Sequence, residues 1–147
     1  MAGVTARVRP ATAADAGAVA GLAGELAQSF AFARASFDEH YPALLAAGHA
    51  CVLVADTGAD CAGYLLGFEH LTFYANGRVA WVEEVFVRGD LRGRGIGRAL
   101  MAAFEDWARR RGCVLAALAT RRAAPFYRAL GYQESAAYLR KLLPGPG

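Results

Sequence analysis

The chain has 147 residues, 56% of them hydrophobic and 20% charged, with a net charge of +3. This length suits a single domain, which we expect over residues 1–143, followed by a flexible tail at 144–147. No apolar run approaches the ~20 residues that span a bilayer, and the first residues lack the apolar stretch of a signal peptide. These features exclude a membrane partner and favour a cytoplasmic protein.

The N-terminal part predicts a strand followed by two helical regions. A short alternating strand is expected over 4–8, and Thr12 or Asp15 can cap the helix that follows. The apolar stripe of this helix consists of Val19, Leu22, Ala23 and Leu26. Residues 29–47 predict a second helical region, which Pro42 interrupts or restarts. Its many aromatic residues are typical of a core and also of a pocket wall.

The middle of the chain predicts three strands joined by hairpin turns. Residues 49–55 and 61–69 are rich in apolar and β-branched side chains and are separated by a turn. Asn76 and Gly77 together form the strongest short hairpin signal in the sequence. The strand that follows, over 81–87, is apolar except for two glutamates.

The next segment predicts a glycine-rich loop and an amphipathic helix. Arg88 to Gly97 contains four glycines besides its arginines, and from Ile96 onward apolar residues recur at helical spacing. Gly112 suits the end of this helix. Because amides at a helix N-terminus have no helical partner and the helix dipole is positive there, such a loop favours a phosphate.

The remaining chain predicts a strand, a short helix and a final strand. The strand is expected over 114–119, the helix from Pro125 to Leu130, and the closing strand over 132–142. The order is then β-α-α-β-β-β-α-β-α-β. It predicts an α/β fold whose mixed sheet starts antiparallel and continues through two right-handed crossovers.

Three phosphate-binding patterns compete for the loop. A P-loop requires a Gly-Lys pair, and the only lysine is Lys141. A dinucleotide fingerprint requires glycine or alanine at position 98, which is Arg98. The third pattern, Arg/Gln-x-x-Gly-x-Gly/Ala, is met by Arg92, Gly95 and Gly97, and about thirty residues later AAPFYRALGY (123–132) matches an A-x-x-F-Y-x-x-x-G-F/Y ending. Together these motifs resemble the acyl-CoA-binding core of the GCN5-related N-acetyltransferase (GNAT) superfamily.

The resemblance implies where acetyl-CoA, the co-substrate, would bind. Its pyrophosphate would lie on the loop residues Arg92, Gly93, Arg94, Gly95, Ile96, Gly97 and Arg98. Its pantetheine arm would pair with the backbone of Val85, Phe86 and Val87 like an added strand. Tyr127 matches the family tyrosine near the sulfur, which makes it the candidate general acid. Thr120 stands where the family often has asparagine, so one cofactor contact is in doubt.

Two adjacent glutamates supply the candidate base. Strict alternation would separate Trp81, Glu83, Val85 and Val87 from Val82, Glu84 and Phe86, so that one glutamate alone points into the acceptor cleft. By resemblance Glu83 is the general base, acting through water, and Glu84 is structural or contacts the substrate. A salt bridge from either acid to a neighbouring arginine is the structural alternative. Glu69 is a further acid expected near the cleft.

The other titratable residues give weaker signals. The three cysteines are odd in number and lack metal-ligand spacing, so we expect free thiols and no metal. Of the three histidines, His70 lies at a strand end near Glu83 and is the candidate substrate contact.

The sequence therefore predicts an N-acetyltransferase that acts on a primary amine of a small molecule or a protein. Clustered acids favour a cationic acceptor. The alternatives are a non-catalytic acyl-CoA sensing module and an arginine-rich domain that binds protein or nucleic acid. Because the positive residues gather around the loop and its helix, an anionic cofactor explains them better than nucleic acid. A final strand and an exposed tail also allow a homodimer.

Overall fold

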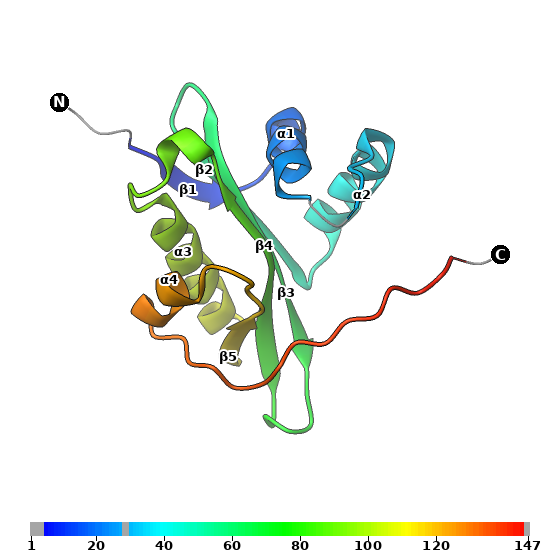
Figure 1. Ribbon diagram of the computed structural model, residues 1–147, viewed down its shortest axis with the longest axis vertical. Helices are drawn as coiled ribbons and strands as arrows, with labels where there is room; N and C mark the ends of the chain where they lie inside the picture. Colours follow the sequence, from blue (N-terminus) through cyan, green and yellow to red (C-terminus); the bar gives the residue numbers. More distant parts are fainter. Residues whose placement is uncertain (1–4, 28–29, 146–147) are drawn as a thin grey trace.

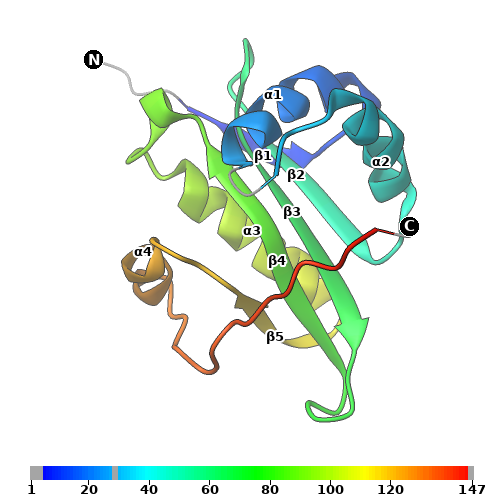
Figure 2. The same ribbon diagram turned by 45° about the vertical axis from the view of Figure 1, so that its right-hand side comes forward.

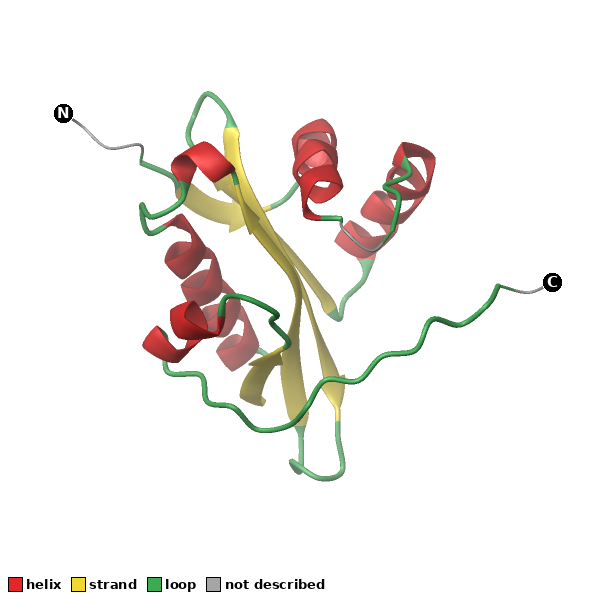
Figure 3. Ribbon diagram, viewed as in Figure 1, coloured by secondary structure: helices red, strands yellow, loops and turns green. Residues whose placement is uncertain are grey.

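The structure is a computed structural model that describes residues 5–27 and 30–145. A five-stranded sheet separates two helical layers (Figures 1 and 3). The strands are β1 (Arg7–Pro10), β2 (Ala50–Asp56), β3 (Cys61–Leu71), β4 (Arg78–Val87) and β5 (Cys113–Leu118). The helices are α1 (Ala16–Leu26), α2 (Arg34–Ala46), α3 (Ile96–Arg110) and α4 (Ala124–Ala129), with 3-10 turns η1 (Ala13–Asp15) and η2 (Gly89–Leu91). Helices α1 and α2 cover one face, and α3 and α4 lie against the other.

The sheet confirms the predicted mixed architecture. Strands β1 to β4 pair antiparallel in sequence order, and β5 then pairs parallel to β4 after the crossover through α3. The hairpin between β3 and β4 forms as expected, with Asn76 at a φ of 59°. Helix α2 continues through Pro42, so the predicted interruption there is wrong.

The predicted closing strand over 132–142 is also wrong in this structure. Residues 132–145 have no secondary structure, and β5 is the edge of the sheet. Tyr132 is held in the layer of α3 and α4. Its hydroxyl donates to Glu105 of α3 at 2.9 Å, and its amide donates to the Tyr127 carbonyl. The residues beyond it lack an alternating apolar face that could fix a strand register. They run as an extended segment past β5 and β4 toward α2 (Figure 2).

The core consists of one apolar cluster on each face of the sheet. The cluster against α3 includes Leu53, Leu65, Val82, Leu100 and Phe104. The cluster beneath α1 and α2 includes Val19, Leu22, Tyr41, Val54 and Tyr64. Each large side chain of this kind contributes about 1.5–3 kcal/mol when it is fully buried. The central strands are thus fixed from both sides, which makes them a rigid platform for a site.

Gly67 allows α3 to approach β3, and its replacement should destabilise the protein. A Cβ at this position would lie 2.8 Å from Cζ of the fully buried Phe104 ring and closer still to Cε1. We expect Gly67→Ala to lower the free energy of unfolding by about 1–3 kcal/mol, the usual cost of overpacking. Urea unfolding measures this change. As a control, Gly21→Ala in α1 meets no atom within 4 Å, so it should leave the stability unchanged or raise it; equal losses in both variants would contradict this account.

Candidate active site

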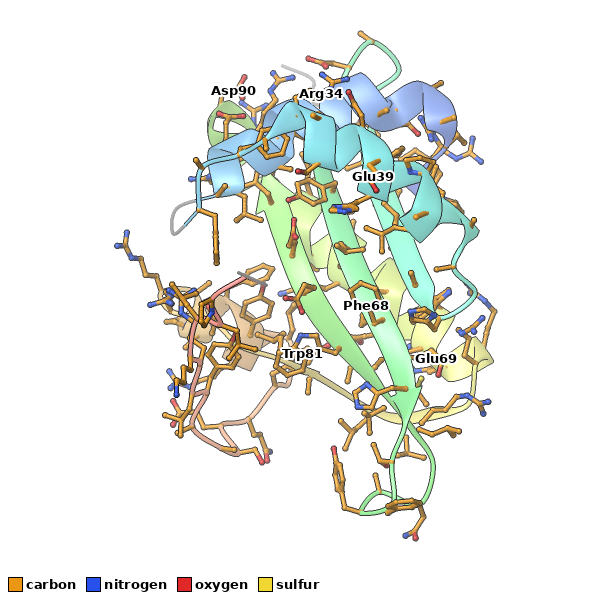
Figure 4. The ribbon with its side chains drawn as sticks, turned by 90° about the vertical axis from the view of Figure 1, so that its right-hand side faces the viewer. Arg34, Glu39, Phe68, Glu69, Trp81 and Asp90 are labelled. Carbon is orange, nitrogen blue, oxygen red and sulfur yellow. The ribbon has the colours of Figure 1, made fainter. Side chains whose placement is uncertain are left out.

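A cavity of about 980 Å³ lies between the α1–α2 layer and the sheet, and it reaches the segment between β5 and α4. Its polar and charged lining residues are Ser36, His40, Tyr41, Tyr64, Glu83, Glu84, Arg92, Thr120, Arg121, Arg122, Tyr127 and Arg140. Its apolar wall includes Phe30, Phe32 and Phe37, from the aromatic-rich region between α1 and α2 and from α2 itself. Figure 4 looks onto this face of the sheet, where Phe68 and Trp81 lie below the helices. The aromatic residues of the second helical region thus line a pocket, which is one of the two roles expected for them.

A β-bulge at Glu83 brings both glutamates to this cavity. Leu66 pairs with Glu84 while Gly67 pairs with Val82, so Glu83 is an extra residue in β4. The strict alternation expected along this strand is therefore wrong. Val82, Val85 and Val87 all pack in the cluster against α3, whereas Phe86 packs beneath α1 and α2.

The expectation that one glutamate alone reaches the cleft is also wrong, because the two carboxylates share the cavity in different surroundings. Glu83 is exposed, and its Oε2 accepts a hydrogen bond from the Trp81 indole at 2.7 Å. Glu84 is half-buried, and its Oε1 accepts a hydrogen bond from the Tyr64 hydroxyl at 2.7 Å. Within the described residues neither glutamate forms a salt bridge, so the structural alternative of an arginine partner is not realised. Both carboxylates remain available to a ligand.

Strands β4 and β5 separate at the bulge. Their pairing ends where Val82 meets Leu118, but β4 continues to Val87. The β4 backbone beyond Val82 therefore has no strand beside it on the β5 side. A free strand edge can pair with an extended ligand through backbone hydrogen bonds. This is the place where the sequence predicts a pantetheine arm along Val85, Phe86 and Val87.

The glycine-rich loop ends in a bare helix N-terminus. Gly93 and Gly95 have φ angles of 77° and 82°, a region that favours glycine. Gly95 is the N-cap of α3, and no side chain caps the helix. The first bond of the helix runs from the Ala99 amide to the Gly95 carbonyl. The preceding amides have no helical partner and point toward the loop, as an anion site requires.

The arginines of the loop have different roles. Arg88 pairs with Asp60 and Asp90, so its charge is used within the protein. Arg92 folds back, with its Nε donating to the Val87 carbonyl at 3.1 Å and its guanidinium 5.2 Å from the Phe86 ring centre. Arg94 and Arg98 are exposed and form no salt bridge within the described residues. These two guanidinium groups could reach a bound phosphate.

Helix α4 places Tyr127 on the cavity wall and Phe126 beside the start of α3. The Phe126 ring lies against α3, since a Cβ at Gly97 would come within 3.3 Å of its Cζ. Tyr127 is half-buried and lines the cavity, and burial raises the pKa of its hydroxyl. The phenol therefore stays protonated at neutral pH and can donate a proton. Thr120 accepts a hydrogen bond from the Ala123 amide at 3.0 Å, so in this structure it caps the turn before α4.

Two expected residues lie elsewhere. His70 is exposed at the end of β3 and is not part of the cavity lining. Glu69 is buried, and Arg78 and Arg111 bind it at 3.2 and 2.9 Å. Figure 4 shows it beside the end of α3, apart from Trp81. Glu69 thus ties the sheet to α3 instead of facing the cleft.

The sequence did not indicate several residues that line the cavity. His40 comes from α2, while Arg121 and Arg122 follow β5. Tyr64 sits in the middle of β3, where an apolar strand gives no sign that its hydroxyl meets Glu84. That contact depends on the register between β3 and β4, which is not local in sequence.

Among the described residues, three other features would indicate a different function: a metal site, a membrane-spanning helix or a reactive cysteine. No group of histidine, cysteine and acidic side chains there could hold a metal ion. None of the described helices is both long and apolar enough to cross a membrane. Cys51 and Cys61 are buried, and all three cysteines are free thiols. Burial raises the pKa of Cys51 to about 12, so this thiol is not a ready nucleophile.

Several solved structures share this fold. A transcriptional regulator from Bacillus halodurans C-125 matches with a TM-score of 0.84 and 22% identity, over 94% of this chain and 99% of that chain. Glucosamine-6-phosphate N-acetyltransferase from Arabidopsis thaliana matches with a TM-score of 0.83 and 20% identity, over 95% and 99%. Aminoglycoside N-acetyltransferase AAC(6')-Iy, solved with CoA, matches with a TM-score of 0.82 and 21% identity, over 95% and 97%.

The sequence itself identifies the family. No curated protein sequence matches the chain. The model of the acetyltransferase (GNAT) family, however, matches residues 21–132, a range that holds the bulged strand, the glycine-rich loop and Tyr127. This match covers most of the chain and agrees with the fold. The chain therefore belongs to the GNAT acetyltransferase family.

Proposed function

We propose that this protein transfers an acetyl group from acetyl-CoA to a primary amine of a small molecule or peptide. One observation carries the proposal: the place where β4 leaves β5 holds a free strand edge beside two carboxylates and Tyr127, next to the bare N-terminus of α3. These are the parts that thioester binding and amine activation require. Family membership supports the reaction class.

The residues present fit acetyl-CoA. The amides at the start of α3, together with Arg94 and Arg98, would hold the pyrophosphate. The β4 backbone over 85–87 would pair with the pantetheine arm. Acetyl-CoA supplies an activated thioester carbonyl. The protein's task is then to bring a neutral amine to that carbonyl and to move two protons.

The proton transfers are assigned to Glu83 and Tyr127. Glu83 accepts the proton that the amine loses as its nitrogen attacks the thioester carbonyl, directly or through water. Tyr127 donates a proton to the sulfur as the carbon–sulfur bond breaks, so free CoA leaves as a neutral thiol. The exposed position of Glu83 on the bulge gives water access to it. General acid and base groups of this kind add ~10²–10⁴-fold to the rate each.

The alternative is a module that binds acyl-CoA without turnover. Both readings predict that CoA raises the melting temperature, because it binds the folded state. Incubation with acetyl-CoA and a panel of primary amines, with free thiol as the readout, separates them. Thiol release that depends on the amine supports the enzyme, and CoA binding without any release supports the sensor.

The acceptor and the assembly state belong to this proposal. The solved neighbours include enzymes for glucosamine-6-phosphate and for aminoglycosides, which supports an amine-bearing acceptor.

We also propose a homodimer, supported by the exposed C-terminal segment and the open edge of β5. Light scattering would give twice the 15.5 kDa chain mass for such a dimer and the single mass for a monomer.

A further inference from the structure

The hydrogen bond between Tyr64 and Glu84 is the feature of the cavity that the proposed proton transfers leave unexplained. Tyr64 is 2% exposed, and its hydroxyl donates to Glu84 Oε1 at 2.7 Å. It comes from the centre of β3, packed beneath α1 and α2. Burial, and next the nearby carboxylate, raise the pKa of Tyr64. The hydroxyl therefore remains a donor at any working pH.

Glu84 differs from the other fixed carboxylates of the chain. Glu69, Asp15 and Asp56 each bind one or two arginines. Within the described residues, Glu84 has a neutral hydroxyl as its one side-chain partner and no cation. A half-buried carboxylate held in one orientation without a counter-ion is suited to bind a positive group of a ligand.

We propose that Tyr64 is a positioning residue that holds the Glu84 carboxylate as an anchor for a second positive group of the acceptor. This inference rests on the proposed N-acetyltransferase function and adds the class of acceptor. An ammonium that stays paired with Glu84 throughout the reaction keeps its proton, so it serves to bind the acceptor and is not the group that attacks the carbonyl. The two glutamates therefore divide the work: Glu83 deprotonates the amine that is acetylated, and Glu84 binds another ammonium of the same molecule. The acceptor is then a diamine or polyamine type of compound.

The test compares diamines with amino alcohols of equal length, using acetyl-CoA and the wild-type protein. The two acceptor types differ only in the group that would meet Glu84. We expect kcat/KM to be about tenfold or more higher for the diamine, since a charged hydrogen bond contributes about 1.5–3 kcal/mol. Glu84→Gln should remove this preference by raising the KM of the diamine. Because glutamine can still accept the Tyr64 hydrogen bond, this variant separates charge from folding.

Tyr64→Phe should act on the same preference through Glu84. We expect the diamine KM to rise several-fold while its kcat and the CoA affinity stay near the wild-type values. Added to Glu84→Gln, Tyr64→Phe should lower the preference no further, because the two residues act as one unit. Tyr132→Phe is the matched control: it also removes a tyrosine–glutamate hydrogen bond, to Glu105, and it should keep the wild-type ratio between the acceptor types.

The outcomes separate this inference from the proposed function. Equal kcat/KM for diamines and amino alcohols in the wild type would overturn the anchor and leave the acetyltransferase standing. The anchor would also be overturned if Tyr64→Phe raised the KM of diamines and amino alcohols equally, because that result would indicate a general loss of structure. Absence of turnover with every amine would overturn both proposals.

Discussion

Tyr127→Phe is expected to lower kcat by about 10²–10⁴-fold, the contribution of a positioned general acid. The ring would keep its contacts with Phe126 and Tyr132, so the loss would come from the hydroxyl alone. CoA affinity should stay nearly constant, because the phenol acts on the sulfur only as the thioester breaks. Steady-state kinetics, with calorimetric titration of CoA, measures both quantities.

Tyr138→Phe provides the control for that variant. Tyr138 is 62% exposed in the C-terminal segment and lies outside the cavity lining. It should have wild-type kcat and KM. If Tyr127→Phe also retained the wild-type kcat, water would protonate the departing thiolate and the assignment of the acid would be wrong.

Glu83→Gln is the second variant with a large expected effect. Glutamine nearly preserves the size of the side chain and can still accept the Trp81 indole hydrogen bond, but it cannot take a proton from the amine. We expect kcat to fall by about 10²–10⁴-fold at neutral pH. Raising the pH should restore part of the rate, because more of the acceptor is then already neutral. Rates measured across a pH series with one amine test this.

Glu84→Gln is the companion variant for Glu83. The two residues are neighbours in the same cavity, and the substitution removes the same charge. For Glu84→Gln we expect a higher KM for the acceptor with kcat largely kept. The reversed pattern, with kcat lost in Glu84→Gln alone, would show that Glu84 is the base.

The local elements could be predicted from sequence because their signals are local. The helical spacing after Ile96, the Asn76-Gly77 turn and the stop at Gly112 depend on neighbouring residues, and each formed as expected. The family motifs also lie within short stretches. The order of the sheet followed from these elements and from the rule that a strand–helix–strand crossover gives parallel strands.

The positions of the site residues depend on contacts that are distant in sequence. The bulge at Glu83 arises in the pairing of β3 with β4, and alternation along one strand cannot reveal it. Tyr64 and Glu84 meet only through the same register. Glu69 was expected in the cleft, but Arg111, 42 residues away, binds it on the other side. Non-local pairing, rather than propensity, decides each of these cases.

The C-terminal segment shows a different limit. A closing strand is predicted here, yet the segment starts against α3, through the bond between Tyr132 and Glu105, and continues without a partner strand. Tyr138, Leu139, Leu142 and Leu143 are exposed there. Because no apolar face alternates along the segment, no register with the edge of β5 is favoured, and residues 132–145 stay outside the sheet.

Calorimetric titration of CoA into the wild-type protein and into the double variant Arg94→Ala/Arg98→Ala tests the central claim most directly. We predict one CoA bound per chain by the wild type and an affinity at least about tenfold lower in the double variant, because two charge-assisted contacts to phosphate are lost. Arg109→Ala/Arg110→Ala, which removes the same charge at the opposite end of α3, should bind CoA like the wild type. No binding by the wild type, or equal affinity in all three proteins, would contradict a cofactor site at the start of α3.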